Sequence, residues 1–214
     1  MRSYGQYCSV AKALDVVGER WNLLIVRELL LRGPCRYTDL RQGLPGIATN
    51  LLGDRLRDLE QAGVVRRRPA SPPVATDLFE LTDSGTALAP VLRALGEWGA
   101  RYMSGDAGGD VFCGHWLAFP VSLYLRAPAD RDLTVEVRVG GTPMTIEAVG
   151  GELQVSPGHA ADPALVLQGE AQLVLGVIAG QLDLDEARRA GLEVQGDAQV
   201  LALLRAAPME GAAL

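Results

Sequence analysis

Leucines recur at helical spacing within the first hundred residues of this chain. In "ATNLLGDRLRDLEQAG", residues 48–63, Leu52, Leu56 and Leu59 fall on one face of a helix drawn at about 100° per residue. The opposite face is polar and consists of Asn50, Asp54, Arg57 and Gln61, with Gly53 beside them. The spacing therefore predicts an amphipathic helix with its leucines in a core and its polar face free for another purpose.

Similar patterns predict the elements on either side of this helix. Three apolar-periodic segments precede it, "SVAKALDVVG", "RWNLLIVRELLLRG" and "YTDLRQGL", and the last of them stops at Pro45-Gly46. Two strand-like segments, "VVRRR" and "DLFELT", follow it and flank the proline-rich tip "PASPPVAT". Thr82 is placed to cap a final long helix, and Pro90 predicts a kink or a late start there. The expected order is four helices, a hairpin and a helix.

The pattern changes after "MSGDAGGD", residues 103–110, a glycine-rich stretch that reads as a linker. Beyond it, "LTVEVRV", "PMTIEAV" and "ELQVS" alternate apolar and polar residues, and "PALVLQG" and "LEVQG" predict two further strands. A buried helix is expected from Gln172 to Leu182, and a closing helix is expected to start at Asp197. The sequence predicts an α+β protein of two domains, residues 1–104 and 111–214.

Charge also differs between these two halves. Residues 1–104 hold 14 Lys+Arg and 11 Asp+Glu, whereas residues 105–214 hold 6 and 15, so a positive part precedes an acidic one. Such asymmetry indicates parts with different partners. The total of −6 does not exclude nucleic-acid binding, which needs only a local basic face.

The two helices around Pro45-Gly46 form a candidate helix-turn-helix. In that motif the second helix, the recognition helix, enters the major groove of DNA by its N-terminal end. The residues then expected near bases and phosphates are Thr49, Asn50, Gly53, Asp54 and Arg57. Asn can pair with adenine and Arg with guanine or a phosphate, while Asp54 can accept from cytosine or hold an arginine in position.

The hairpin that follows carries Arg66, Arg67 and Arg68 beside its tip. A basic hairpin in this position is typical of a wing that contacts phosphate or the minor groove. A run of three arginines alone is weak evidence, since charge runs are usually solvated faces. Helix-turn-helix, basic hairpin and helix in this order together favour binding to a double-stranded DNA operator.

Residues 7 to about 102 resemble the HxlR family of bacterial winged-helix regulators. The resemblance rests on "GERW", the "PGI" turn, the run "LRDLEQAGVVRRR", "LTDSG" and the final Trp98. It implies a homodimer formed by the outer helices. The chain departs from the family pattern at Ser9, Ala48 and Asn50; because Ala48 replaces a serine that often caps the recognition helix, Thr49 is the expected cap.

Residues from about 111 onward resemble a sterol-carrier-protein-2-like (SCP2-like) domain in "VEVRVGGTPMTIEAVGGELQV" and "ADPALVLQGEAQLVLGVIAGQLD". The resemblance implies a sheet covered by helices that encloses an apolar small-molecule effector. The expected lining is Trp116, Phe119, Leu123, Val177 and Ile178. Three alternatives stay open: these residues simply fill a core, the domain only braces the dimer, or the chain is a lipid-binding or transfer protein.

Other function classes find little support in the sequence. Phosphate-cradling loops, H-E-x-x-H and G-x-S-x-G motifs are absent, so an enzyme is not expected. Three cysteines and two histidines are too scattered for a disulfide framework or a metal site, and we expect no cofactor. Cys8, near Arg2 and Lys12, is a candidate redox switch. A secretory signal is not apparent, and the longest uncharged run, Val111 to Leu125, is too short to span a membrane, so a cytoplasmic protein is expected.

Overall fold

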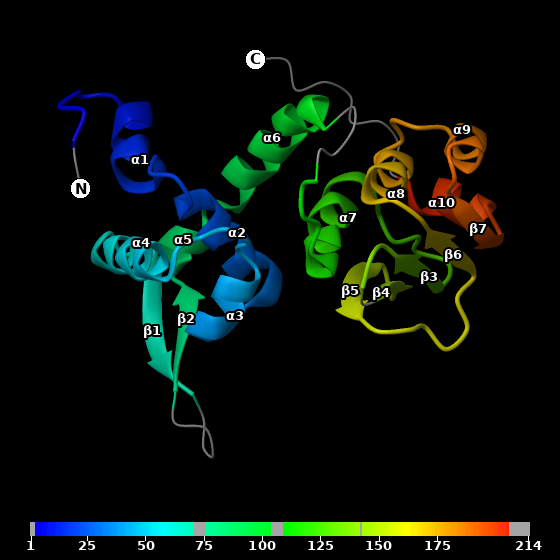
Figure 1. Ribbon diagram of the computed structural model, residues 1–214, viewed down its shortest axis with the longest axis horizontal. Helices are drawn as coiled ribbons and strands as arrows, with labels where there is room; N and C mark the ends of the chain where they lie inside the picture. The colour runs from blue at the N-terminus through cyan, green and yellow to red at the C-terminus, as the bar shows by residue number, and fades with distance from the viewer. Residues whose placement is uncertain (1–2, 71–75, 104–108, 142, 206–214) are drawn as a thin grey trace. The chain divides into compact units, whose positions relative to one another are not determined.

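The computed structural model describes residues 3–70, 76–103, 109–141 and 143–205 of the chain (Figure 1). Two compact units make up the chain, Met1–Gly99 and Ala100–Leu214, and each is considered by itself. The predicted linker and the predicted hairpin tip both fall mostly outside the described residues. Within the described residues, every helix is too short or too polar to cross a membrane.

The first unit has the predicted order of helices and strands. Its elements are α1 (Ser9–Val17), α2 (Asn22–Arg32), α3 (Tyr37–Gln42), α4 (Thr49–Gln61), β1 (Val65–Pro69), β2 (Asp77–Leu81), α5 (Asp83–Thr86) and α6 (Ala89–Gly99). The short helix α5 was not predicted. Thr82 caps this helix rather than the long helix that it was expected to cap, because its hydroxyl accepts a hydrogen bond from the amide of Gly85 at 3.2 Å. Helix α6 starts late, at Ala89, so that Pro90 lies in its first turn, where proline is tolerated.

The leucine spacing of α4 correctly predicted its buried face. Leu52, Leu56 and Leu59 are at most 1% exposed, and Ile25 and Leu40 are equally buried in the core of the same unit. Burying such side chains contributes about 1.5–3 kcal/mol each. The core therefore fixes the rotation of α4 about its axis, and with it the residues that α4 presents to solvent.

The second unit is a five-stranded sheet with helices. A short 3₁₀ helix, Gly114–Leu117, leads into α7 (Ala118–Tyr124), and the sheet strands are β3 (Leu133–Arg138), β4 (Met144–Val149), β5 (Glu152–Pro157), β6 (Leu165–Gln168) and β7 (Glu193–Gly196). Their order is β5-β4-β3-β6-β7, with β3 and β6 parallel and the other neighbours antiparallel. The remaining helices are α8 (Ala171–Ile178), α9 (Leu184–Arg189) and α10 (Gln199–Leu204).

The predicted helix bounds in this unit were partly wrong. Helix α8 ends at Ile178 rather than Leu182, because the amides of Gln181 and Leu182 both turn back to the carbonyl of Gly176. Helix α9 was missed, although Asp183 caps it by accepting from the amides of Asp185 and Glu186. Helix α10 begins at Gln199, since Asp197 instead accepts a hydrogen bond from the amide of Gln199 before the helix starts.

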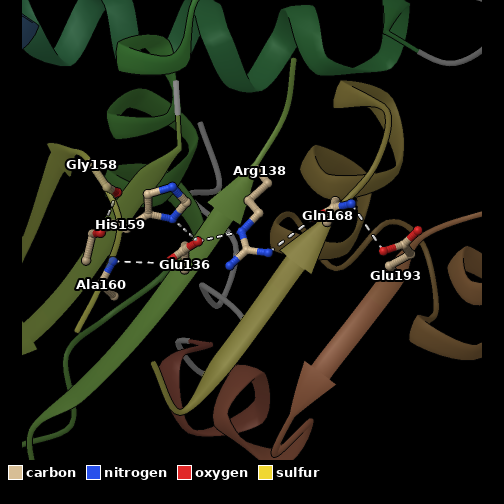
Figure 2. A network of polar contacts seen from close by, with 8 residues as sticks. Glu136, Arg138, Gly158, His159, Ala160, Gln168 and Glu193 are labelled. Carbon is tan, nitrogen blue, oxygen red and sulfur yellow. Dashed lines mark hydrogen bonds and ion pairs between the residues drawn. The ribbon is translucent and has the colours of Figure 1, made fainter. Parts of the chain in front are cut away.

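The two faces of the sheet differ in character. Val135, Val137, Ile146, Leu165 and Leu167 point to one face and share a core with residues of α7, α8, α9 and α10. The alternate residues of β3, Glu136 and Arg138, point to the other face and join the polar network drawn in Figure 2. The helices therefore cover one face of this sheet, as in a two-layer α+β unit.

Candidate nucleic-acid interface

A tight turn sets the angle between α3 and α4. The amide of Ile47 donates to the carbonyl of Leu44 at 3.2 Å, and Gly46 between them has φ +85°. A positive φ at the third position of a turn favours glycine, which explains the Pro45-Gly46 pair. The hydroxyl of Tyr37, in the first turn of α3, donates to the carbonyl of Thr49 and ties the two helices together.

The expectation that Thr49 caps α4 was wrong. Ala48 is the N-cap residue and Thr49 is the first helical residue, so its hydroxyl has no capping role. Helix α4 therefore begins without a side-chain cap, which leaves backbone amides at its start free for another acceptor. Thr49 and Asn50 are both exposed there.

The predicted polar face of α4 is exposed in the structure. Asp54 and Arg57 form an ion pair one turn apart, and Gly53, between them and the start of the helix, has open space where a side chain would lie. The carboxylate of Asp54 therefore holds the guanidinium of Arg57 in position. This is one of the two roles that the sequence analysis left open for Asp54.

The three arginines of the hairpin divide between its two faces. Arg66 lies opposite Glu80 in the β1–β2 register, and the Nε atoms of Arg66 and Arg68 each donate to Glu80 at 2.8 Å. Arg67 points to the other face, with its guanidinium 5.0 Å from the centre of the Phe79 ring and its Nε 2.9 Å from Glu60 of α4. Only Arg67 therefore faces the recognition helix.

A cleft of about 380 Å³ lies between the helix-turn-helix and the hairpin. It brings Arg57 of α4 and Arg67 of β1 together in one site, along with Tyr37 of α3. The full lining is Tyr37, Gly53, Leu56, Arg57, Arg67, Thr76, Asp77 and Phe79. Of the residues predicted to contact DNA, the cleft includes three and leaves Thr49, Asn50, Asp54, Arg66 and Arg68 outside it.

Several residues of this region were missed by the sequence analysis. Arg36 and Arg41, at the two ends of α3, are exposed and form no ion pair within the described part of the chain. The first helix of a helix-turn-helix crosses the DNA backbone, which makes these two arginines candidate phosphate contacts. Glu60 and Glu80 were missed because their arginine partners are distant in sequence.

The buried carboxylate of Glu28 in α2 helps to position the helix-turn-helix. Glu28 of α2 is fully buried and accepts from Arg27 at 2.9 Å, and Arg32 Nη1 lies 4.0 Å from it. Arg32 also donates to the carbonyl of Asp39 in α3 at 2.8 Å, and Gly43 leaves the space that the Glu28 carboxylate occupies. This cluster joins α2 to α3 and so positions the helix-turn-helix.

The cysteines have three different surroundings. Cys8 is exposed at the N-cap position of α1, where the nearby backbone amides of Ala11 and Val10 lower the pKa of its thiol. Burial raises the pKa of the Cys35 thiol to about 11. Cys113 is half-buried. Of the three, Cys8 combines exposure with a lowered thiol pKa, and both features favour reactivity.

The five residues expected to line an effector pocket are not equivalent. Val177 and Ile178 are fully buried in the core of the second unit, beside Leu117 and Val121 of the preceding segment. Trp116, Phe119 and Leu123 are half-buried, and the ring of Trp116 meets that of Phe112 edge-on at 6.3 Å. The cleft described above lies in the first unit and includes none of the five.

The helix-turn-helix with its basic hairpin defines a winged helix-turn-helix transcriptional regulator, which is not an enzyme. A family model described as "HxlR-like helix-turn-helix" matches residues 16–107. The HTH-type regulator YvaP of Bacillus subtilis is 36% identical over 92 residues, 43% of this chain and 84% of YvaP. YodB, another HTH-type regulator of that organism, is 32% identical over 101 residues, 47% of this chain and 87% of YodB. The chain belongs to the HxlR-like helix-turn-helix family.

Two solved structures are similar to part of this chain. The reduced form of YodB from B. subtilis has 31% sequence identity and a TM-score of 0.41, and it covers 47% of this chain and 100% of that protein. The redox regulator HypR, in its reduced form, has 28% identity and a TM-score of 0.40, and the match covers 45% of this chain and 95% of HypR.

Proposed function

We propose that the chain binds a double-stranded DNA operator as a homodimer, with α4 in the major groove and the β1–β2 hairpin on the backbone. The single observation that carries this proposal is the cleft in which Arg57 of α4 and Arg67 of β1 meet. Phosphate contacts position a protein on DNA, and base contacts give specificity. Selection of bound duplexes from a random DNA pool tests the proposal and supplies the operator for the measurements that follow.

Mutations in α4 and in the hairpin should then have different effects. Asn50→Ala or Arg57→Ala should cost about 1–3 kcal/mol of operator binding and relax preference at one base pair if the residue reads a base. The double change Arg66→Ala and Arg68→Ala should weaken all sequences alike and make the slope of log K against log salt shallower, by about 0.9 per lost phosphate contact. Fluorescence anisotropy with operator and scrambled duplexes distinguishes the loss of a base contact from the loss of phosphate contacts.

Arg188→Ala is a matched control for Arg57→Ala. Arg188 forms an ion pair with Asp185 one turn away on α9, as Arg57 does with Asp54 on α4, but it lies in the second unit. Operator affinity should be unchanged in this variant. Equal affinity of the native protein and of both sets of α4 and hairpin variants would refute the docking proposed here.

The homodimer is supported by apolar side chains exposed on two helices. Val10 and Leu14 of α1 are 65% and 44% exposed, and Leu95 and Trp98 of α6 are 45% and 52% exposed. Exposed apolar side chains grouped on a helix face often mark a protein interface. We expect a dimer in solution whose half-sites lie about one helical turn of DNA, roughly 10 base pairs, apart.

Leu95→Glu should shift this dimer to a monomer, because a carboxylate would be buried against an apolar surface. Light scattering at micromolar concentration measures the change. Leu24→Glu is the control, since Leu24 is 39% exposed on α2 of the same unit and lies on neither of these two helices. A native protein that is monomeric at this concentration contradicts the dimer.

For the second unit we propose an SCP2-like module, supported by its sheet with helices on one face. Full burial of Val177 and Ile178 favours an interior filled by its own side chains, and hence a bracing role. An apolar effector that modulates operator binding is the finer proposal, and it would enter beside the half-buried Trp116, Phe119 and Leu123. If apolar ligands leave operator affinity unchanged, the proposal of an effector is wrong and the proposal that this unit braces the dimer stands.

A redox switch at Cys8 is the second candidate mechanism of control. The observation that favours it is the exposed thiol with a lowered pKa at the start of α1, the helix that also carries Val10 and Leu14. Oxidation there would act on the proposed dimer. An oxidant that changes operator affinity equally in the native protein and in Cys8→Ser would exclude it.

A further inference from the structure

Two parts of the proposed DNA-binding face, helix α4 and the β1–β2 hairpin, together have no net charge. Helix α4 and strands β1 and β2 together contain five arginines, Arg55, Arg57, Arg66, Arg67 and Arg68, and five carboxylates, Asp54, Asp58, Glu60, Asp77 and Glu80. All five arginines form ion pairs with carboxylates. Because nonspecific DNA affinity comes from cations that replace counterions on phosphate, this arrangement needs an explanation.

Glu80 holds two of the hairpin arginines at once. One of its carboxylate oxygens accepts from Arg66 and the other from Arg68, each at 2.8 Å, and its side chain is 12% exposed. Hydrogen bonds from Arg68 and Arg66 lower the pKa of Glu80, so it is ionised at neutral pH. The face of the hairpin that carries Arg66 and Arg68 therefore has two guanidinium groups that share one carboxylate, that of Glu80.

On the other face of the hairpin, Glu60 forms an ion pair with one arginine, Arg67. Its two carboxylate oxygens lie 2.9 Å from Nε and Nη2 of Arg67, and its side chain is 24% exposed. Nη2 donates a hydrogen bond to one of these oxygens, and the charge of the carboxylate lies against the same edge of the guanidinium. Arginine presents that edge to a phosphate as well, so Glu60 occupies the part of Arg67 that a phosphate in the cleft would use.

We propose that Glu60 and Glu80 are internal competitors of DNA phosphate that set the specificity of this regulator. They hold the hairpin arginines in place but reduce their attraction for any DNA backbone, so that stable binding requires the base contacts of α4 as well. This inference rests on the proposed operator binding and deepens it. It makes the two glutamates specificity-determining residues that need not touch a base.

The test compares Glu80→Gln and Glu60→Gln with the native full-length protein. Each variant removes one negative charge, so affinity for a random-sequence duplex should rise about three- to tenfold, because the arginines lose a competing partner and the phosphates meet one repulsive charge fewer. The slope of log K against log salt should become steeper by about one for Glu80→Gln. Operator affinity should rise less, so the ratio of operator to random-sequence affinity falls.

Two further variants separate charge from structure. Glu80→Asp keeps the negative charge and should stay within about twofold of the native affinity for the random duplex. Because Gln has the shape of Glu and Asp is shorter, a steric role for Glu80 would give the opposite pattern, with Glu80→Gln close to the native affinity and Glu80→Asp altered. Asp185→Asn is the control for net charge, because it frees Arg188 from its ion pair in the second unit. It should leave both affinities and the salt slope unchanged.

The outcomes distinguish this inference from the proposed function. A native protein that binds neither duplex at low salt overturns the proposed function itself. A native protein that binds, with Glu60→Gln and Glu80→Gln showing unaltered affinity and salt slope, overturns the competitor role alone. The competitor role is also overturned if Asp185→Asn raises affinity for the random-sequence duplex as much as Glu60→Gln and Glu80→Gln do, because net charge rather than the local ion pairs would then be responsible. Thermal unfolding of each variant identifies any loss of folded protein, and Glu60→Gln carries the test if Glu80→Gln unfolds.

Discussion

Replacing Gly85 by alanine should destabilise the first unit by about 3 kcal/mol, at the upper end of the range for overpacked sites. A Cβ at this position would lie 2.2 Å from the carbonyl oxygen of Val64 and 2.9 Å from a methyl group of Leu81. The obstacle is main chain, and it cannot swing away as a side chain would. The hydroxyl of Thr82 donates to the carbonyl of Gly63 at 2.6 Å and holds α5 against this point.

Gly53→Ala is the matched control in the same unit. Gly53 has no neighbouring atom within 4 Å of an added Cβ, and glycine inside a helix costs about 0.5–1 kcal/mol relative to alanine, so this change should stabilise or be neutral. Amide hydrogen exchange in α4 and β1, with urea unfolding, reports the first unit specifically. Equal stability of the Gly85→Ala variant and the native protein would show that α5 can move away from the hairpin without cost.

Glu136→Gln should destabilise the second unit, and the effect should disappear in acid. Burial by itself raises the pKa of Glu136, but hydrogen bonds from Arg138, His159 and the amide of Ala160 outweigh it and lower the pKa to about 2 (Figure 2). A carboxylate with a lowered folded pKa stabilises the fold above its unfolded pKa, about 4.5 here, and that stability is lost as the pH falls toward 2.

The expected loss is about 3 kcal/mol at pH 6, from 1.36 kcal/mol for each pKa unit. The difference between the native protein and Glu136→Gln should shrink progressively below about pH 4.5 and be small near pH 2. Urea unfolding across this pH range, followed by exchange in β3 and β4, gives the comparison. Glu147→Gln, at an exposed position of the adjacent strand β4, should have little effect at any pH. A pH-independent difference would mean that the Glu136 carboxylate is not stabilised by its charge.

The sequence predicted what depends on local spacing. The period of Leu52, Leu56 and Leu59 was sufficient to orient α4, because one buried face fixes the rotation of a helix. The alternation in "LTVEVRV" correctly placed Val135 and Val137 on the core face of β3. Alternation alone gives no sign that Glu136, on the opposite face of β3, is buried as well, at 1% exposed.

What escaped prediction depends on contacts between distant residues. Glu136 is buried because His159 and Ala160 lie against it, and a segment more than 20 residues away leaves no mark on the local pattern. The pairing of Arg66 with Glu80 likewise requires the strand register, which the proline-rich tip conceals. Thr49 was misplaced by a single residue at a helix boundary, the least reliable point of any pattern.

Because Arg66 and Arg68 share the carboxylate of Glu80, the hairpin cannot be described one arginine at a time. Deleting either guanidinium leaves the whole of Glu80 to the other, so the two single changes will not sum to the double change. An alanine scan would assign each arginine a value that depends on its neighbour. Arg66, Arg68 and Glu80 therefore act as one unit across the two strands of the hairpin, and the effect of a substitution at any one of them depends on which residues occupy the other two positions.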